Sequence, residues 1–201
     1  MVDKVMFSSE STEYGTPQDL FDELNREFYF NLDPAATFKN KKCSHFYTEE
    51  QDGLKQPWDI SVWQDTVPIE AGKKRTPGRV FCNPPYGRKE KACDEKTCTK
   101  KRCQKRGYHL KEDVPGTSAW VEKAYREVFE LKRAEVAVLL LPARTCQPWF
   151  HNYIYNKNRP RANTEIRFLK GRVKFEGADY GAAFPSMIVI FKKHQRLTLR
   201  P

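Results

Sequence analysis

The sequence predicts an α/β fold in which a mostly parallel sheet ends in an antiparallel C-terminal edge. Short apolar runs alternate with helical patterns through most of the chain, which is typical of a parallel sheet covered by helices. The last apolar runs follow one another closely, which favours antiparallel strands. The length of 201 residues suits one domain spanning 1–201, and an aromatic content of 13% indicates a packed core.

The first helix is expected to begin at Thr16 and to end near Phe28. Thr16 is a favourable N-cap, Pro17 fits the first helical position, and Asp19 suits the positive end of the helix dipole. Apolar residues at helical spacing form one face, namely Leu20, Phe21, Leu24 and Phe28. Residues 1–15 are expected to be poorly ordered or to serve as a lid.

The remaining elements follow from apolar runs and turn residues. A second helix is expected from about 117 to 132, capped by Thr117 or Ser118, and a short helix from 149 to 155. The buried face of the second helix should carry Val121, Tyr125, Val128 and Leu131. Loops are expected at 55–78 and 156–163, and strands at 30–32, 45–48, 80–82, 136–141, 166–169, 173–175 and 187–191.

Residues 88–113 differ in composition from the rest of the chain. They hold ten Lys or Arg against five Asp or Glu, and this net charge of +5 is half of the +10 of the whole chain. They contain few aliphatic residues and three cysteines. We therefore expect an inserted loop or small subdomain rather than part of the sheet.

The cysteines of this insertion have the composition of a metal site. Cys93, Cys98, Cys103 and His109 offer three soft ligands and an imidazole, a complete set for tetrahedral zinc. A polar segment with almost no core also needs a staple. The alternative is three unrelated cysteines in a basic loop, and Cys43 is a second candidate for the place of His109.

The tetrapeptide Asn83-Pro84-Pro85-Tyr86 follows the expected buried strand 80–82. Prolines cannot continue a central strand, so the chain must turn at the carboxyl end of the strand, where open α/β sheets bind ligands. The turn brings together an amide oxygen, a proline carbonyl and an aromatic face. This set suits a planar base that carries an exocyclic amino group. The alternative is an ordinary loop, because Asn, Pro and Gly are common in turns.

The charge of the chain indicates its class of partner. With a net charge of +10, a polyanion is the expected partner, either nucleic acid or an anionic surface. No apolar run approaches the roughly 18 residues that cross a membrane, and no secretory signal precedes the first helix. We therefore expect no membrane association, a cytoplasmic location, and cysteines that are thiols or metal ligands. Nothing in the sequence indicates an obligatory protein partner.

Motifs in one order along the chain resemble the phage-encoded DNA N-6-adenine methyltransferase family, often called phage Dam. The similar segments are 16–24, 32–36, 52–54, 81–87, 140–145 and 168–172. They are distributed over most of residues 14–192. The resemblance implies a Rossmann-like methyltransferase sheet, S-adenosylmethionine as cofactor and DNA as substrate, in a host cytoplasm if the protein is encoded by a phage or prophage.

The resemblance also implies where the cofactor lies. Residues of three segments would contribute: Thr16 and Pro17 would cover it, Asp33, Pro34 and Ala35 would line its methionine end, and Glu50 or Asp52 would reach ribose hydroxyls or the adenine amino group, with Asn83 beside them. One departure from the usual pattern is that residues 35–37 contain no glycine, although Ala35 is small enough for close approach.

The tetrapeptide would carry the chemistry. The Asn83 side-chain oxygen and the Pro84 carbonyl would accept the two N–H bonds of the adenine amino group and stabilise the charge that develops on it. Tyr86 would stack on the base and Pro85 would stiffen the turn. The base would be flipped out of the duplex. No covalent intermediate is needed, so Cys82 and Cys146 are expected to be core thiols.

Basic residues of the insertion and of the 156–163 loop would hold the DNA, mainly through phosphates. They are Arg88, Lys100, Lys101, Arg102, Lys105, Arg106, Arg159 and Arg161. Two alternatives stay open. One is the same chemistry on RNA or on a protein glutamine. The other is a zinc-stapled DNA-binding module without catalysis.

Overall fold

The computed structural model describes residues 15–61 and 76–193, and these form one mixed sheet with helices on both faces. The six strands lie in the order β2-β1-β3-β4-β8-β7. Their bounds are Leu32–Asp33 (β1), His45–Phe46 (β2), Gly78–Cys82 (β3), Ala134–Pro142 (β4), Thr164–Phe168 (β7) and Ser186–Lys192 (β8). The first four strands are parallel, and β8 is antiparallel to both of its neighbours. The predicted fold class is therefore confirmed.

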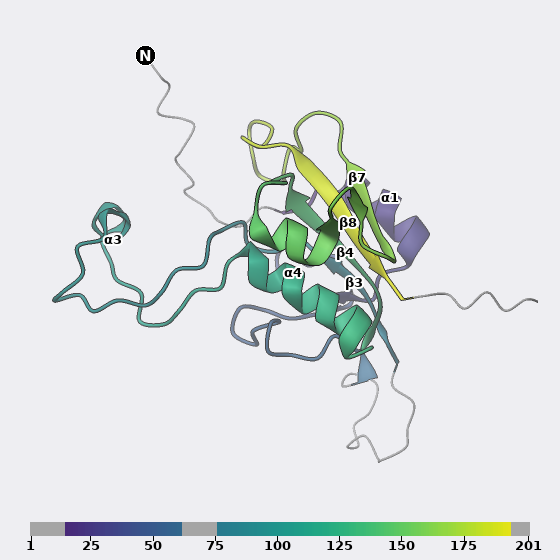
Figure 1. The fold of residues 1–201 in the computed structure, drawn as a ribbon, viewed down its shortest axis with the longest axis horizontal. Coiled ribbons are helices and arrows are strands. Elements are labelled where there is room, and N and C mark those ends of the chain that lie inside the picture. Colours follow the sequence, from purple (N-terminus) through teal and green to yellow (C-terminus); the bar gives the residue numbers. More distant parts are fainter. Residues whose placement is uncertain (1–14, 62–75, 194–201) are drawn as a thin grey trace, which may run out of the picture.

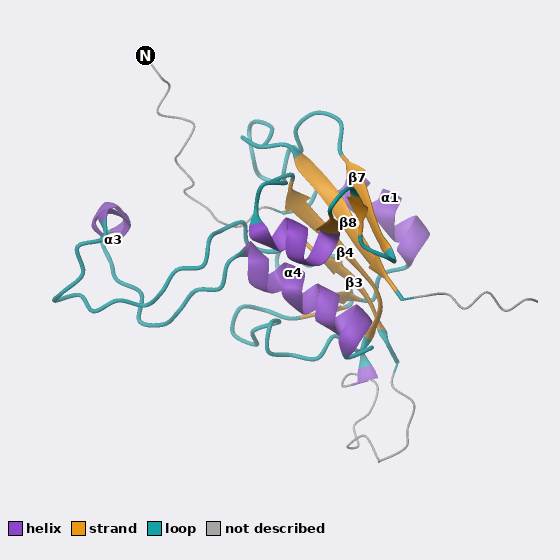
Figure 2. Cartoon of the chain, in the orientation of Figure 1, coloured by secondary structure: helices purple, strands orange, loops and turns teal. Residues whose placement is uncertain are grey.

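Helices cover the two faces of this sheet (Figure 2). They are α1 (Gln18–Phe28) on one face and α4 (Thr117–Tyr125) on the other, with π-helical turns at Arg126–Glu130 (η2) and Phe150–Ile154 (η3). Helix α3 (Lys101–Arg106) lies apart from the sheet, in the insertion. Strand β4 shows why both faces are covered. Its residues Val136, Val138 and Leu140 pack in the cluster under α1, whereas Ala137, Leu139 and Leu141 pack in the cluster under α4. Since successive side chains of a strand point to opposite faces, a wholly apolar strand requires a layer on each side.

The two expected N-caps are wrong. Pro17 occupies the N-cap of α1 and Gly116 that of α4, and neither helix has a side-chain cap. Thr16 is buried because the preceding Gly15 forms an antiparallel bridge with Glu176, which draws this segment onto the body of the protein. The expected lid at residues 1–15 lies outside the described residues except for Gly15.

The buried face expected for the second helix is only partly correct. Val121 and Val128 are buried and Tyr125 packs against the same core, but Leu131 is 40% exposed. The π-helical turn η2 adds a residue to the helical turn and so shifts the positions that follow it.

Three further expectations are wrong, two about secondary structure and one about a cysteine. Residues 173–175 form no strand, although Phe175 is buried, and residues 156–163 are not simply a loop. They contribute to a small antiparallel hairpin of β5 (Tyr155–Asn156) and β6 (Arg159–Pro160). Cys82 is buried as expected, but Cys146 is exposed.

Among the described residues, no helix has the length and apolar character that a membrane span requires.

Candidate functional site

Parallel pairing brings the ends of β1 and β3 to one edge of the sheet. Leu32 pairs with Val80, so Asp33 at the end of β1 and Asn83 just after β3 emerge on the same side. The carboxyl end of β4 lies at this edge too, since Cys82 pairs with Leu139. Open parallel sheets bind their ligands at this edge.

The Asn83 amide is held by the tyrosine of the same turn. The Tyr86 hydroxyl lies 2.6 Å from Asn83 Oδ1 and 3.1 Å from the Leu140 carbonyl oxygen. The rings of Phe175 and Phe184 pack edge-on with the Tyr86 ring, at centroid distances of 6.0 and 5.5 Å. The hydroxyl therefore links the amide to β4, and the aromatic cluster fixes the position of the hydroxyl.

Helix α4 holds the exit of this turn. The Thr117 hydroxyl donates to the Pro85 carbonyl at 3.1 Å and accepts the Gly87 N–H at 3.2 Å. The Thr117 N–H donates to the Gly87 carbonyl at 2.9 Å. A Cβ on Gly116 would lie only 2.5 Å from the backbone nitrogen of Lys89. The start of α4 and the chain after the turn therefore approach so closely that only a glycine fits at position 116.

Asp33 is a buried carboxylate at the end of β1, with 4% of its surface exposed. It accepts the N–H groups of Lys42 at 3.2 Å and Ala35 at 3.4 Å. Burial raises its pKa to about 6, and these hydrogen bonds and the charge of Lys42 offset the effect only in part. A cationic group placed beside Asp33 would therefore be bound favourably.

The segment around Thr16 is tied to the strand edge that carries Asp33. Lys42 Nζ lies 2.9 Å from Gln18 Oε1 and 2.7 Å from Glu176 Oε1. Glu176 in turn donates its N–H to the Gly15 carbonyl at 2.8 Å. The start of α1, including Thr16 and Pro17, is thereby connected to the chain just after the Asp33 turn.

The Asp52 and Asp33 turns pack backbone against backbone. A Cβ on Gly53 would lie 1.9 Å from the Pro34 carbonyl oxygen. Asp52 itself has a positive φ of 54° and accepts the Leu54 N–H at 3.2 Å, and its carboxylate pairs with Lys55 at 3.0 Å. The Asp52 side chain is therefore engaged within its own turn.

Glu50 has a different setting. It is exposed and lines a hollow of about 350 Å³ together with Phe38 and Phe46, whose rings pack edge to face at 5.3 Å. This hollow lies beside the edge strand β2. Glu50, one of the two acidic residues expected at the cofactor, therefore lines a hollow at the edge of the sheet.

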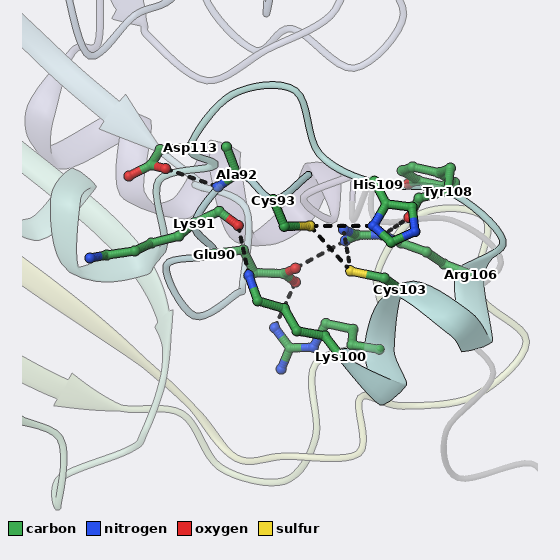
Figure 3. Close-up of polar contacts among 11 residues, drawn as sticks. Glu90, Lys91, Ala92, Cys93, Lys100, Cys103, Arg106, Tyr108, His109 and Asp113 are labelled. Carbon is green, nitrogen blue, oxygen red and sulfur yellow. Dashed lines mark hydrogen bonds and ion pairs between the residues drawn. The ribbon is translucent and has the colours of Figure 1, made fainter. Parts of the chain in front are cut away.

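The cysteine cluster of the insertion is assembled, and Figure 3 shows three of its members, Cys93, Cys103 and His109. The metal-ligating atoms of these three residues and of Cys98 all lie within 4.8 Å of one another. Cys93 Sγ lies 3.6 Å from Cys103 Sγ and 3.5 Å from His109 Nδ1. Cys43 packs elsewhere, in the core cluster that includes α1. The group expected from the sequence is thus brought together with His109 rather than with Cys43.

The insertion projects from the body as an arm with α3 near its far end (Figure 1). Glu90 and Val114 exchange backbone hydrogen bonds of 2.8 and 3.0 Å and close its base. Glu90 also pairs with Arg102 at 2.6 Å and with Arg106 at 2.9 Å. These two arginines therefore hold the arm together, whereas Lys101 and Lys105 on α3 are exposed.

The other basic residues expected at DNA lie in three places. Lys100 Nζ donates to the Lys91 carbonyl at 3.2 Å within the arm. Arg159 is exposed on the β5–β6 hairpin, while Arg161 donates to the His151 carbonyl at 3.2 Å. Arg88 lines a pocket at the base of the arm.

A protein-family comparison decides the identity. The model of the family described as DNA N-6-adenine-methyltransferase (Dam) matches residues 6–199. The chain belongs to this DNA adenine methyltransferase family. Membership implies S-adenosylmethionine as methyl donor and DNA as substrate. No curated protein and no solved structure matched the chain.

Some residues of this Dam family member lie at the candidate site although no role was predicted for them from the sequence. Arg144, Gln147 and Trp149 line the same pocket as Arg88, just after β4. The signal was present, because Arg144 follows a buried strand in the same way as Asn83. Lys42 and Phe175 offered no local signal, since their roles depend on contacts made between distant segments.

The buried charge of Asp33 predicts a pH dependence. A carboxyl whose pKa is raised on folding, here from 3.8 to about 6, contributes stability below about pH 4 that is lost as the pH rises through about 6. We expect the free energy of unfolding of wild type, relative to Asp33→Asn, to fall by roughly 3 kcal/mol across that window, at about 1.4 kcal/mol per pKa unit. Urea unfolding at a series of pH values measures this, and parallel profiles for the two proteins would refute it.

Proposed function

We propose that this protein transfers a methyl group from S-adenosylmethionine to the exocyclic amino group of adenine in duplex DNA, with the Asn83–Tyr86 turn holding the base. The observation that carries this is the Asn83 amide, held by Tyr86 at the sheet edge that also bears the buried Asp33. Since a base inside the duplex cannot reach this turn, the adenine is flipped out. A phage or prophage origin stays a prediction.

Asn83 and Pro84 supply the polar contacts to the base. The amino nitrogen of adenine is a poor nucleophile because its lone pair is delocalised into the ring. The Asn83 side-chain oxygen and the Pro84 carbonyl accept its two N–H bonds, which stabilises the positive charge that develops on the nitrogen. Tyr86 orients the Asn83 amide through its hydroxyl and offers its ring to the base, and Pro85 stiffens the turn. Positioning supplies much of the rate.

The residues around Asp33 fit the cofactor. When bound, S-adenosylmethionine supplies an electrophilic methyl group on a cationic sulfur. Asp33 faces the cationic methionine end, while Pro34 and Ala35 line it. Thr16 and Pro17 cover it through the link to Lys42. For the nucleoside end we favour Glu50 over Asp52, because the Asp52 carboxylate is already paired with Lys55.

The arm and the hairpin hold the DNA. Exposed Lys101 and Lys105 on α3 and Arg159 on the hairpin contact phosphates, which gives affinity without sequence information. The arm begins two residues after Tyr86, so it lies beside the flipped base and contributes to target recognition. Family membership favours DNA over RNA or a protein glutamine as substrate.

The cysteine cluster fits a structural zinc ion. Ligands of tetrahedral zinc, at bond lengths of about 2.0–2.3 Å, lie roughly 3.5–3.8 Å from one another. The distances from Cys93 Sγ to Cys103 Sγ and His109 Nδ1, 3.6 and 3.5 Å, agree with this. Arg106 also donates to Cys103 Sγ at 3.5 Å, which supports the ligand from outside the cluster. Cys98 completes the set, and the ion would staple the arm.

Removing the amide tests the catalytic role. Asn83→Ala should lower kcat for methyl transfer to duplex DNA by about 100-fold or more, because the developing charge loses its acceptor. Tyr86→Phe keeps the ring but releases the amide, and should lower kcat by about tenfold, the effect of one hydrogen bond. Both variants should still be stabilised by S-adenosylhomocysteine in a thermal-shift assay. Full activity of Asn83→Ala would refute the assignment, and a wild type that S-adenosylhomocysteine does not stabilise would favour the non-catalytic alternative.

Shortening the arm tests its part in recognition. The bridge between Glu90 and Val114 lets a short Gly-Ser linker replace the residues between them without stretching the body. We expect this variant to keep its response to S-adenosylhomocysteine but to lose DNA affinity and target choice, because phosphate contacts on α3 are removed. Electrophoretic mobility shift and methylation-sensitive sequencing measure the two effects. Unchanged affinity and an unchanged target site would contradict the proposal.

Metal analysis tests the zinc site. Mass-spectrometric metal analysis of purified protein should find about one zinc per chain, and a Co²⁺-loaded sample should show the absorption of a tetrahedral thiolate site. Cys93→Ser should lose the metal and make the arm sensitive to proteolysis. Cys146→Ser is the matched control, because this exposed cysteine lies outside the cluster. A wild type free of metal, or full zinc in Cys93→Ser, would contradict the proposal.

A further inference from the structure

A pocket of about 240 Å³ lies at the base of the arm. Three segments form it: the exit of the catalytic turn at Gly87, the start of α4 at Ser118, and the chain after β4 with Arg144 and Gln147. Gly87 directly follows Tyr86, and β4 is the neighbour of β3 in the sheet. The pocket is therefore next to the turn that is proposed to hold the base.

All of the charged side chains that line this pocket are positive. Arg88, Lys89 and Arg144 contribute three cationic groups, and none of the lining residues is acidic. Lys89 also lies 3.7 Å from Asp113 in an exposed pair, which leaves the two arginines to dominate the charge of the pocket. Such a concentration of one sign attracts an anion.

Arg144 is positioned by the aromatic cluster of the catalytic turn. Its guanidinium carbon lies 5.9 Å from the centroid of the Phe184 ring, and that ring packs against Tyr86. A cation over an aromatic face is held electrostatically as well as by packing. Arg144 is thus held by the ring that also packs against the base-binding tyrosine.

The start of helix α4 adds to the preference for an anion. This helix of nine residues has no side-chain cap, and Ser118 of its first turn lines the pocket. Backbone N–H groups and the positive end of the dipole at a helix N-terminus favour anionic ligands. The N-terminus of α4 and the two arginines, which belong to different segments, therefore both favour an anionic ligand.

We propose that this pocket binds a phosphate of the DNA strand next to the flipped adenosine, and that the guanidinium groups of Arg144 and Arg88 contact its oxygens. The proposal rests on the proposed function, since it names a subsite of the same DNA complex. Rotation of a nucleotide out of the duplex moves its flanking phosphates, so an anion site beside the turn holds the strand in its flipped conformation. Arg144 is therefore a DNA-positioning residue and takes no part in the chemistry.

The test compares Arg144→Ala with a matched control. Arg26→Ala removes another exposed arginine, near the C-terminus of α1, where the chain leads into the start of β1 at the opposite edge of the sheet. The probe is a labelled duplex, and its Kd is measured over a range of salt concentrations. Arg144→Ala should reduce the slope of log Kd against log salt by about one and weaken binding by roughly tenfold at moderate salt. Arg144→Lys should keep the slope, and Arg26→Ala should match wild type.

A second measurement separates a phosphate contact from an indirect effect. Once the methylated adenine is located, a neutral methylphosphonate at one of its two flanking positions should weaken wild-type binding and leave Arg144→Ala unaffected. If Arg144→Ala has the wild-type Kd and slope, or if neither methylphosphonate affects wild type differently from the variant, the pocket is not a phosphate site. A wild type that binds the duplex without methylating it would instead refute the proposed function.

Discussion

The parallel pairing of β1 with β3 is the constraint on which the rest of the site depends. Because Leu32 pairs with Val80, the turns that begin at Asp33 and at Asn83 leave the sheet on the same side. A one-residue slip would send each side chain of β3 to the opposite face, and Phe81 could no longer pack under α1. The apolar pattern of the core therefore fixes the arrangement of the polar groups at the edge.

The same edge also explains why the arm is where it is. The chain leaves the Asn83–Tyr86 turn at Gly87 and returns at Thr117, and hydrogen bonds between these two residues close the loop. An insertion between them can grow without disturbing the sheet, because its ends are already joined. The base of the arm stays beside the turn, because both of its ends are joined there. In the proposed complex, the catalytic turn, the phosphate pocket and the arm therefore form one continuous surface for DNA.

Local sequence patterns predicted the strand ends well, because a buried strand followed by prolines must turn whatever lies around it. The cysteine cluster was also predicted, since its members are close in sequence. The failures share a different cause. The N-cap expected at Thr16 fails because the neighbouring Gly15 bridges to Glu176, a contact that no local pattern encodes. Residues 173–175 were predicted to form a strand because their apolar residues alternate. Phe175 is instead buried in a loop, where its ring packs against the ring of Tyr86.

The central claim is that one edge of the sheet holds the cofactor and the flipped adenine side by side. A crystal structure with S-adenosylhomocysteine and a methylatable duplex tests it most directly. We expect the adenine amino nitrogen within about 3.2 Å of the Asn83 side-chain oxygen, a hydrogen-bonding distance, and the homocysteine end beside Asp33. A base that stays stacked in the duplex, or a cofactor bound away from the Asp33 turn, would contradict this account.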